Sequence, residues 1–93
     1  MIKDILIDKK KIGYIEYSIQ QTFEGKSIFI QYLYIEEEER GKGYLSLLFK
    51  TVFGIGRRRR IKIFYLVPTS EELVEVYGRY GFKGDRNIMR YEI

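Results

Sequence analysis

The sequence predicts an α+β fold in which a mixed β-sheet carries two main helices, in the order βββαβαβ(β). Three observations indicate this class. Three apolar segments rich in Ile and Tyr precede any helical pattern. An amphipathic helix then separates the third segment from a fourth, which is the connection that a parallel pair requires. A second amphipathic stretch precedes the last strand-like residues. We therefore expect an antiparallel three-strand meander extended by one parallel pair.

The first three strands are expected at Ile2–Ile7, Ile12–Gln20 and Ser27–Ile35. Residues 8–11 are polar and form the first turn. Residues 21–26 contain a glycine and have the length of a hairpin loop. The third strand is apolar enough to be central in the sheet.

Apolar residues at helical spacing follow the third strand, at Leu45, Leu48, Phe49 and Val52. They predict a first helix over Gly43–Phe53. Because glycine suits a helix C-terminus, we expect this helix to end at residues 54–56, with Arg57–Arg60 beyond it. A fourth strand is expected at Ile61–Val67, and Pro68 ends it.

The second helix is predicted from Thr69, because Thr69 and Glu72 have the spacing of a capping box. It is expected to end at Gly81. A last strand, or a pair of strands, covers Phe82–Ile93 and is split around residues 84–87.

Composition limits the chemistry. The 93 residues, 45% of them hydrophobic, fit one domain over residues 1–93. Cysteine and histidine are absent, which removes a thiol nucleophile and the commonest general base, and argues against a metal site. The net charge of +4 favours anionic ligands in general.

No signal peptide or membrane-length apolar run is visible, so we expect a cytoplasmic protein without membrane partners. The chain is rich in charged residues and has one Asn, three Gln and no Cys. This composition is typical of proteins from hyperthermophiles.

The segment Glu39–Leu45 joins a strand to a helix through two glycines. Such a turn can bind phosphate, because free N–H groups and the positive end of the helix dipole point to one place. The N–H groups of Gly41 and Gly43 would hold a pyrophosphate, and Arg40 and Lys42 would add charge. From these residues alone, an ordinary strand-to-helix turn without a ligand remains the alternative.

Residues Val76–Phe82 by themselves indicate the end of a helix, with Gly81 as its cap. Together with Arg40–Leu45, they resemble the motifs of the GNAT superfamily of N-acetyltransferases. The family's cofactor loop reads Arg/Gln-x-x-Gly-x-Gly/Ala before a helix, and a later motif reads Tyr-x-x-x-Gly-Phe at a helix end. The resemblance covers roughly residues 12–93. It implies a miniature member, without the N-terminal strand and helices that usually form one wall of the acceptor groove.

The resemblance implies acetyl-CoA as co-substrate and N-acetyl transfer to an amine, such as a protein lysine or N-terminus, by direct attack on the thioester. Tyr77 matches a tyrosine that in many members protonates the departing thiolate, and a phenol with a pKa near 10 can do this at pH 7. The glycine loop would face the pyrophosphate, and the end of the third strand would face the pantetheine arm. The implied cofactor-binding residues are Leu33, Tyr34, Ile35, Arg40, Gly41, Lys42, Gly43, Tyr44, Leu45 and Ser46.

Two positions depart from the family pattern. Leu45 stands where the loop motif has Gly or Ala, so its side chain obstructs the phosphates unless it turns into the core. Ser70 stands where an Asn is often found. Without histidine, Glu16 is the candidate general base, and Glu36 or a relayed water are alternatives. The other interpretation of Glu16 is a solvated strand residue.

A different function also remains open. A non-catalytic module of the same fold could bind a partner protein or nucleic acid through its basic surface. Arg57–Arg60 could contact such a polyanion, although a solvated cationic turn is the favoured interpretation of these residues. Because the sheet is aromatic, with nine Tyr and six Phe, we expect a homodimer that buries apolar surface.

Overall fold

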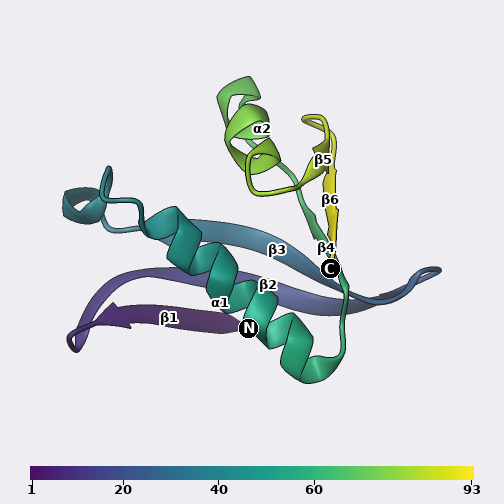
Figure 1. The fold of residues 1–93 in the computed structure, drawn as a ribbon, viewed down its shortest axis with the longest axis horizontal. Coiled ribbons are helices and arrows are strands. Elements are labelled where there is room, and N and C mark those ends of the chain that lie inside the picture. Colours follow the sequence, from purple (N-terminus) through teal and green to yellow (C-terminus); the bar gives the residue numbers. More distant parts are fainter.

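The computed structural model describes residues 1–93 and has the predicted order of elements. Strands β1 (Ile2–Ile7), β2 (Lys10–Thr22) and β3 (Gly25–Ile35) form the meander, and the short 3₁₀ helix η1 (Glu37–Glu39) leads to α1 (Tyr44–Arg59). The chain continues through β4 (Ile63–Leu66), α2 (Glu71–Gly78), β5 (Lys83–Gly84) and β6 (Met89–Glu92). The strands form one sheet in the order β1-β2-β3-β4-β6-β5, in which only β3 and β4 are parallel (Figure 1).

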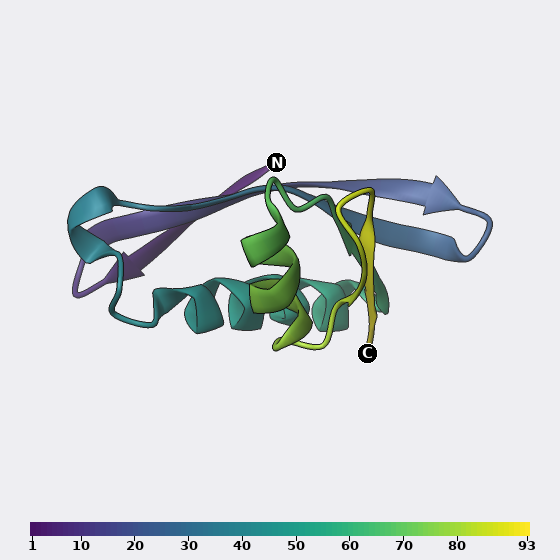
Figure 2. The same ribbon diagram turned by 90° about the horizontal axis from the view of Figure 1, so that it is seen from above.

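Both helices lie on the same side of the sheet, and no helix covers its other side (Figure 2). Helix α1 crosses β2 and β3 and buries Leu48, Phe49 and Val52 completely or almost so. The Phe49 ring also contacts Tyr77, in the last turn of α2, and Tyr80, just after that helix. The ring centroids lie 5.7 and 4.7 Å from that of Phe49. One cluster of 15 buried hydrophobic residues therefore joins the sheet to both helices.

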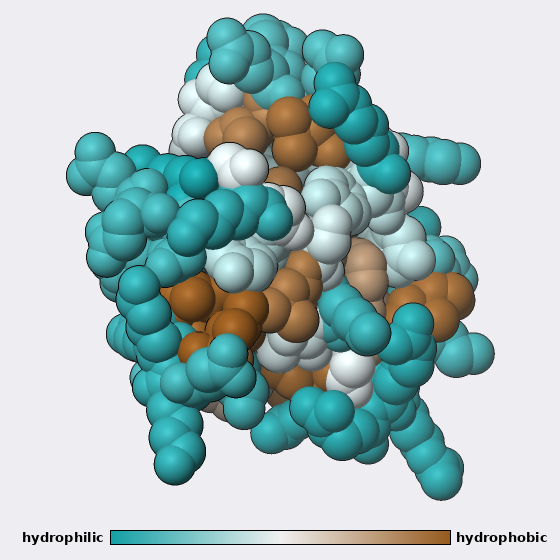
Figure 3. Space-filling model, turned by 60° about the vertical axis from the view of Figure 1, so that its left-hand side comes forward, coloured by the Kyte–Doolittle hydropathy of each residue, from teal (hydrophilic) through white to brown (hydrophobic).

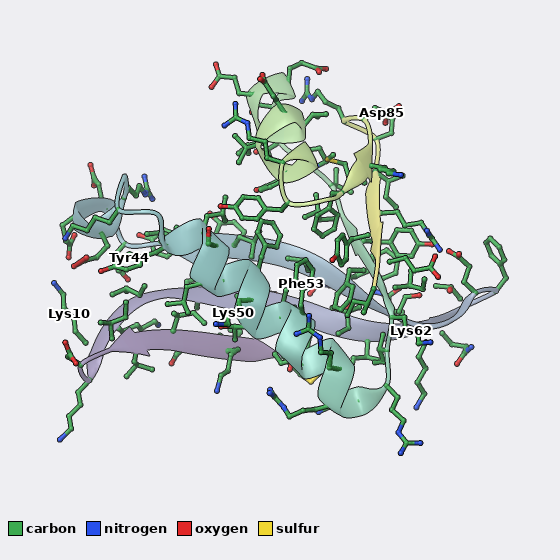
Figure 4. The ribbon with its side chains drawn as sticks, in the orientation of Figure 1. Lys10, Tyr44, Lys50, Phe53, Lys62 and Asp85 are labelled. Atoms are coloured by element: carbon green, nitrogen blue, oxygen red, sulfur yellow. The ribbon has the colours of Figure 1, made fainter.

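Aromatic packing holds the C-terminal strands against α1. Phe53 lies among the side chains between α1 and these strands (Figure 4). Its ring centroid is 5.1 Å from that of Phe64, 6.2 Å from Phe82 and 4.4 Å from Tyr91. Because these residues come from α1, β4, β6 and the segment between α2 and β5, the cluster fixes where β4 and β6 lie relative to the first helix.

The prediction that the first helix ends at residues 54–56 is wrong, because α1 continues to Arg59. A Cβ on Gly56 would lie 2.4 Å from Cζ of Phe64 and 2.8 Å from the carbonyl oxygen of Ile61. Gly56 is therefore needed for close packing rather than for a cap. Arg60 is the C-cap, with a left-handed φ of 58°.

The boundaries of the second helix also differ from the prediction. Its N-cap is Ser70 rather than Thr69, and the Ser70 hydroxyl accepts a hydrogen bond from the Leu73 N–H at 3.2 Å. Ser70 has the extended backbone that suits an N-cap. The helix ends at Gly78 rather than Gly81, because tighter i to i+3 turns follow it.

The fourth strand is shorter than the predicted Ile61–Val67, whereas the last segment forms the expected pair β5 and β6. Neither helix has both the length and the apolar character needed to cross a membrane.

Candidate active site

The strands β3 and β4 separate in the middle of the sheet. They pair only where residues 27–30 face residues 63–66, and beyond Ile30 they run in different directions (Figure 1). A β-bulge lies at the point of separation, because Glu16 pairs with Tyr32 and Tyr17 with Ile30, which leaves Gln31 as the extra residue. The main chain of β3 after Ile30 therefore has no strand partner on the β4 side.

The gap between the two strands holds a cavity of about 200 Å³. It is lined by Ile30, Gln31, Tyr32, Leu33, Leu66, Val67, Thr69, Leu73 and Tyr77. A second hollow of about 240 Å³ shares four of these residues and adds Phe29 and Ile88. Residues of α2 line only the first hollow, and Phe29, which stacks on Tyr65, lines only the second. The gap is therefore accessible from both faces of the sheet.

The glycine loop at the start of α1 has the open backbone that an anion needs. Gly41 and Gly43 have left-handed φ angles of 80° and 83°, and a Cβ on either would meet no atom within 4 Å. The N–H groups of Gly41, Lys42 and Gly43 make no hydrogen bond in the chain, and Gly43 provides no side-chain cap for the helix. The loop thus has N–H groups without partners and open space around its two glycines, a combination that suits a phosphate group.

The two cations of this loop have other partners. Arg40 Nε donates to the carbonyl oxygen of Ile35 at 2.9 Å, and its guanidinium lies over the Tyr34 ring. Lys42 pairs with Glu39 at 3.0 Å, and Lys10 pairs with the same carboxylate at 2.8 Å. Hydrogen bonds from these two lysines hold the pKa of Glu39 below its usual value. Backbone groups, rather than these side-chain charges, are the groups left free for an anion.

Leu45 does not obstruct the loop. Its side chain is half-buried and packs against the hydrophobic core, as does that of Tyr44. Of the two orientations considered for Leu45, the structure has the inward one. The next residue, Ser46, shares a hydrogen bond of 2.9 Å with the Tyr80 hydroxyl and so joins the start of α1 to the end of α2.

Tyr77, on α2, lines the same cavity as the residues of β3. Its ring meets Phe49 edge-on at 5.7 Å, and its hydroxyl makes no hydrogen bond within the chain. Burial raises the pKa of this phenol above its ordinary value. The hydroxyl is therefore protonated at neutral pH and free to donate to a group in the cavity.

The candidate bases lie apart from Tyr77. Glu16 is exposed and points to the helix-free face of the sheet, beside Tyr32. Glu36 follows β3 directly and is half-buried. Neither lines the cavity, whereas Gln31 does. No group of three or more metal-ligating side chains comes together.

The family model described as the acetyltransferase (GNAT) family matches residues 2–82. The chain belongs to the GNAT acetyltransferase family. No curated protein matched the sequence.

Solved GNAT structures have the same fold. PaiA N-acetyltransferase from Thermoplasma acidophilum, in complex with coenzyme A, superposes with a TM-score of 0.77 at 21% identity, over 100% of this chain and 60% of that one. Arabidopsis thaliana Naa50, in complex with the bisubstrate analogue CoA-Ac-MVNAL, has a TM-score of 0.70 at 24% identity, over 88% and 56%. A chain of the KacTA–DNA complex has a TM-score of 0.67 at 20% identity, over 89% and 59%. The chain thus spans less than two thirds of each of these proteins.

Sequence reasoning predicted the glycine loop and Tyr77 as the two ends of the site, but it did not predict most of the residues that line the cavity between β3 and α2. Thr69 and Leu73 line the cavity and were not predicted to do so. A usable signal was present for Leu73, because Leu73 and Tyr77 are four residues apart on one face of α2. The bond between Ser46 and Tyr80 joins residues 34 positions apart, and no local pattern indicates it.

Proposed function

We propose that the chain is an acetyl-CoA-dependent N-acetyltransferase that acts on an amine, such as a protein lysine or N-terminus. One observation carries this proposal: the glycine loop, with its free N–H groups, follows the end of the strand β3, and residues of the same strand line the cavity beside Tyr77. Membership of the GNAT family supports it. So do the CoA bound to PaiA and the CoA-containing analogue bound to Naa50.

Each part of the site has a role in this reaction. The N–H groups of Gly41, Gly43 and the first turn of α1 hold the pyrophosphate. The main chain of Leu33–Ile35, which has no strand partner on the β4 side, orients the pantetheine arm. The cavity accommodates the thioester rather than the whole cofactor, because it is smaller than a typical cofactor pocket.

Acetyl-CoA supplies the thioester. The amine nitrogen bonds to the carbonyl carbon, the carbon–sulfur bond breaks, and the amine loses a proton to Glu16 or to a relayed water. Tyr77 gives its proton to the departing thiolate, which is consistent with its free hydroxyl and raised pKa. Glu16 lies on the face from which an amine would enter the gap, opposite the helices.

Calorimetry with acetyl-CoA tests whether the chain binds this co-substrate, and amine-dependent release of CoA tests whether it transfers the acetyl group to an amine. We expect saturable binding, and CoA release that requires an amine. Absence of binding at millimolar acetyl-CoA would contradict the proposal.

A homodimer remains part of the proposal. Apolar surface is exposed in several patches, one of them at the level of α2 (Figure 3). Phe23 is fully exposed and Val67 is 59% exposed. Light scattering at micromolar concentration tests this, and a monomer mass would contradict it.

A second candidate function is polyanion binding at the other end of α1. Lys3, Arg58 and Arg59 line a hollow of about 250 Å³, and none of them makes an ion pair. The glycine loop lies roughly 22 Å away, since α1 rises about 1.5 Å per residue. KacTA was solved with DNA. Binding to a DNA duplex should fall steeply as salt increases, and a flat salt response would reject this function.

A further inference from the structure

The helix-free face of the meander carries two rows of paired side chains. Because residues opposite each other in adjacent strands point to the same face, the pairing register defines these rows. One row is Asp4, Tyr14 and Tyr34, and the next is Ile2, Glu16 and Tyr32. The three tyrosine rings stack on one another, at centroid distances between 5.2 and 6.3 Å. Three aromatic rings and two carboxylates therefore share one open surface.

Two of the three rings already hold a cation of the chain itself. Lys11 Nζ lies 5.2 Å from the centre of the Tyr14 ring and pairs with Asp4 at 3.2 Å. The Arg40 guanidinium lies 5.6 Å from the centre of the Tyr34 ring. An aromatic face beside a carboxylate attracts cations, and the Lys11 site shows this combination on this surface.

The third ring has the same surroundings but no cation. Tyr32 is 52% exposed and has no lysine or arginine over its ring. Its partner across the strands is Glu16, whose carboxylate makes no ion pair. Tyr32 also lines the cavity that contains Tyr77. The unfilled position is thus at the mouth of the proposed acetyl-transfer site.

We infer that Tyr32 and Glu16 form a subsite that binds the acceptor in its ammonium form, and that the Tyr32 ring is the residue that favours a charged amine over an uncharged one. This inference rests on the proposed function. The ammonium lies against the Tyr32 ring, and Glu16 balances its charge. One proton passes to water before the neutral amine attacks, and the proton lost after the attack goes to Glu16 or to a relayed water. An arylamine, which is uncharged at neutral pH, gains nothing from either group.

The same surface does not suit two other occupants. Stacked rings beside cations can bind single-stranded nucleic acid, but Asp4 and Glu16 would repel its phosphates. A second copy of the chain would have to bury the unpaired Glu16 carboxylate, which is unfavourable without a cationic partner.

Choline and its uncharged carbon analogue 3,3-dimethyl-1-butanol test the cation site without any turnover. In a titration followed by NMR, choline should shift the Tyr32 ring signals and the neutral analogue should not. The shift should disappear in Tyr32→Leu and weaken in Glu16→Gln. It should persist in two controls, Phe23→Leu at the exposed hairpin tip and Glu72→Gln on the surface of α2. Equal responses to both probes, or none, would overturn the inference, as would displacement of choline by a single-stranded oligonucleotide.

Kinetics then test the link to the acceptor. With benzylamine as acceptor, Tyr32→Leu should raise KM by roughly 3- to 30-fold, the range expected for a lost cation–π contact. With aniline, KM should not change. An equal rise for both amines would overturn the assignment of acceptor class.

The proposed function is tested separately, by acetyl-CoA binding to the same variants. If choline binds at Tyr32 but acetyl-CoA does not bind, the acetyltransferase proposal fails and the acceptor role of this site fails with it. If acetyl-CoA binds but choline does not, only the cation site is rejected.

Discussion

Replacing Gly43 by alanine should separate cofactor binding from folding. The residue has a φ of 83°, where alanine is strained by roughly 1–2 kcal/mol. At about 4–8 °C per kcal/mol for a domain of this size, the melting temperature should fall by roughly 4–16 °C. The new methyl group meets no atom of the chain within 4 Å, so this conformational strain is the main expected cost to stability.

The effect on CoA has a different origin. The methyl group would enter the space in front of the free N–H groups and hold the pyrophosphate away from them. Loss of one hydrogen bond to a charged group is worth roughly 1.5–3 kcal/mol. At 1.4 kcal/mol per factor of ten, the Kd for CoA should rise about 10- to 150-fold.

Gly25 provides a matched control. It also has a positive φ, of 103°, and a Cβ there would also meet nothing within 4 Å, but it lies in the β2–β3 hairpin. Gly25→Ala should lose similar stability and keep the CoA affinity of the parent chain. Calorimetry with CoA, at a temperature where both variants are folded, measures the difference. Equal CoA affinity in the two variants would refute the phosphate role of the glycine loop.

Three other outcomes are expected. Tyr77→Phe should slow acetyl transfer by roughly 100-fold or more, as expected for the loss of a general acid, and should leave CoA affinity unchanged. An unaltered rate in a transfer assay would show that this phenol takes no part in the mechanism. Gly56→Ala should lower the free energy of unfolding by about 1–3 kcal/mol in chemical denaturation, because its Cβ would lie 2.4 Å from Phe64. Gly54→Ala, whose nearest contact would be at 3.5 Å, should raise it by about 0.5–1 kcal/mol. A change of the same sign in both variants would show that close packing is not the reason for Gly56. Glu39 has a lowered pKa in the folded chain, so its contribution to stability is complete above the unfolded pKa near 4.3 and is lost as pH falls through the folded pKa. Acid denaturation of Glu39→Gln should lack this pH-dependent contribution. Identical profiles of stability against pH for the variant and the parent chain would count against the two lysine pairs.

The sequence predicts the strands and the order of the elements well, because alternation and helical spacing are local properties. The first strand agrees with the prediction at both ends, and the third differs at one end by two residues. The end of α1 was mispredicted for a physical reason. Glycine occurs both at helix ends and where a helix packs closely on another element, and only the position of Phe64 distinguishes these uses at Gly56.

In the candidate site too, local features could be predicted from the sequence, whereas features that depend on tertiary packing could not. The glycines of the loop and Tyr77 are recognisable from local motifs; in the structure Tyr77 lines the cavity beside β3, and the glycine loop has open space around Gly41 and Gly43. The partners of Arg40 and Lys42 could not be predicted, because a sequence pattern gives a charge without saying which neighbour neutralises it. The direction of Leu45 depends in the same way on packing against the core.

Backbone amide NMR during a titration with CoA tests the central claim most directly, since it reports where the cofactor binds as well as whether it binds. The N–H signals of Gly41, Gly43 and Ser46 should shift together with those of Leu33–Ile35, and saturate at one CoA per chain. Saturable shifts confined to Arg57–Arg60 and Lys62, or no shifts at millimolar CoA, would contradict an acetyl-CoA site between the glycine loop and Tyr77.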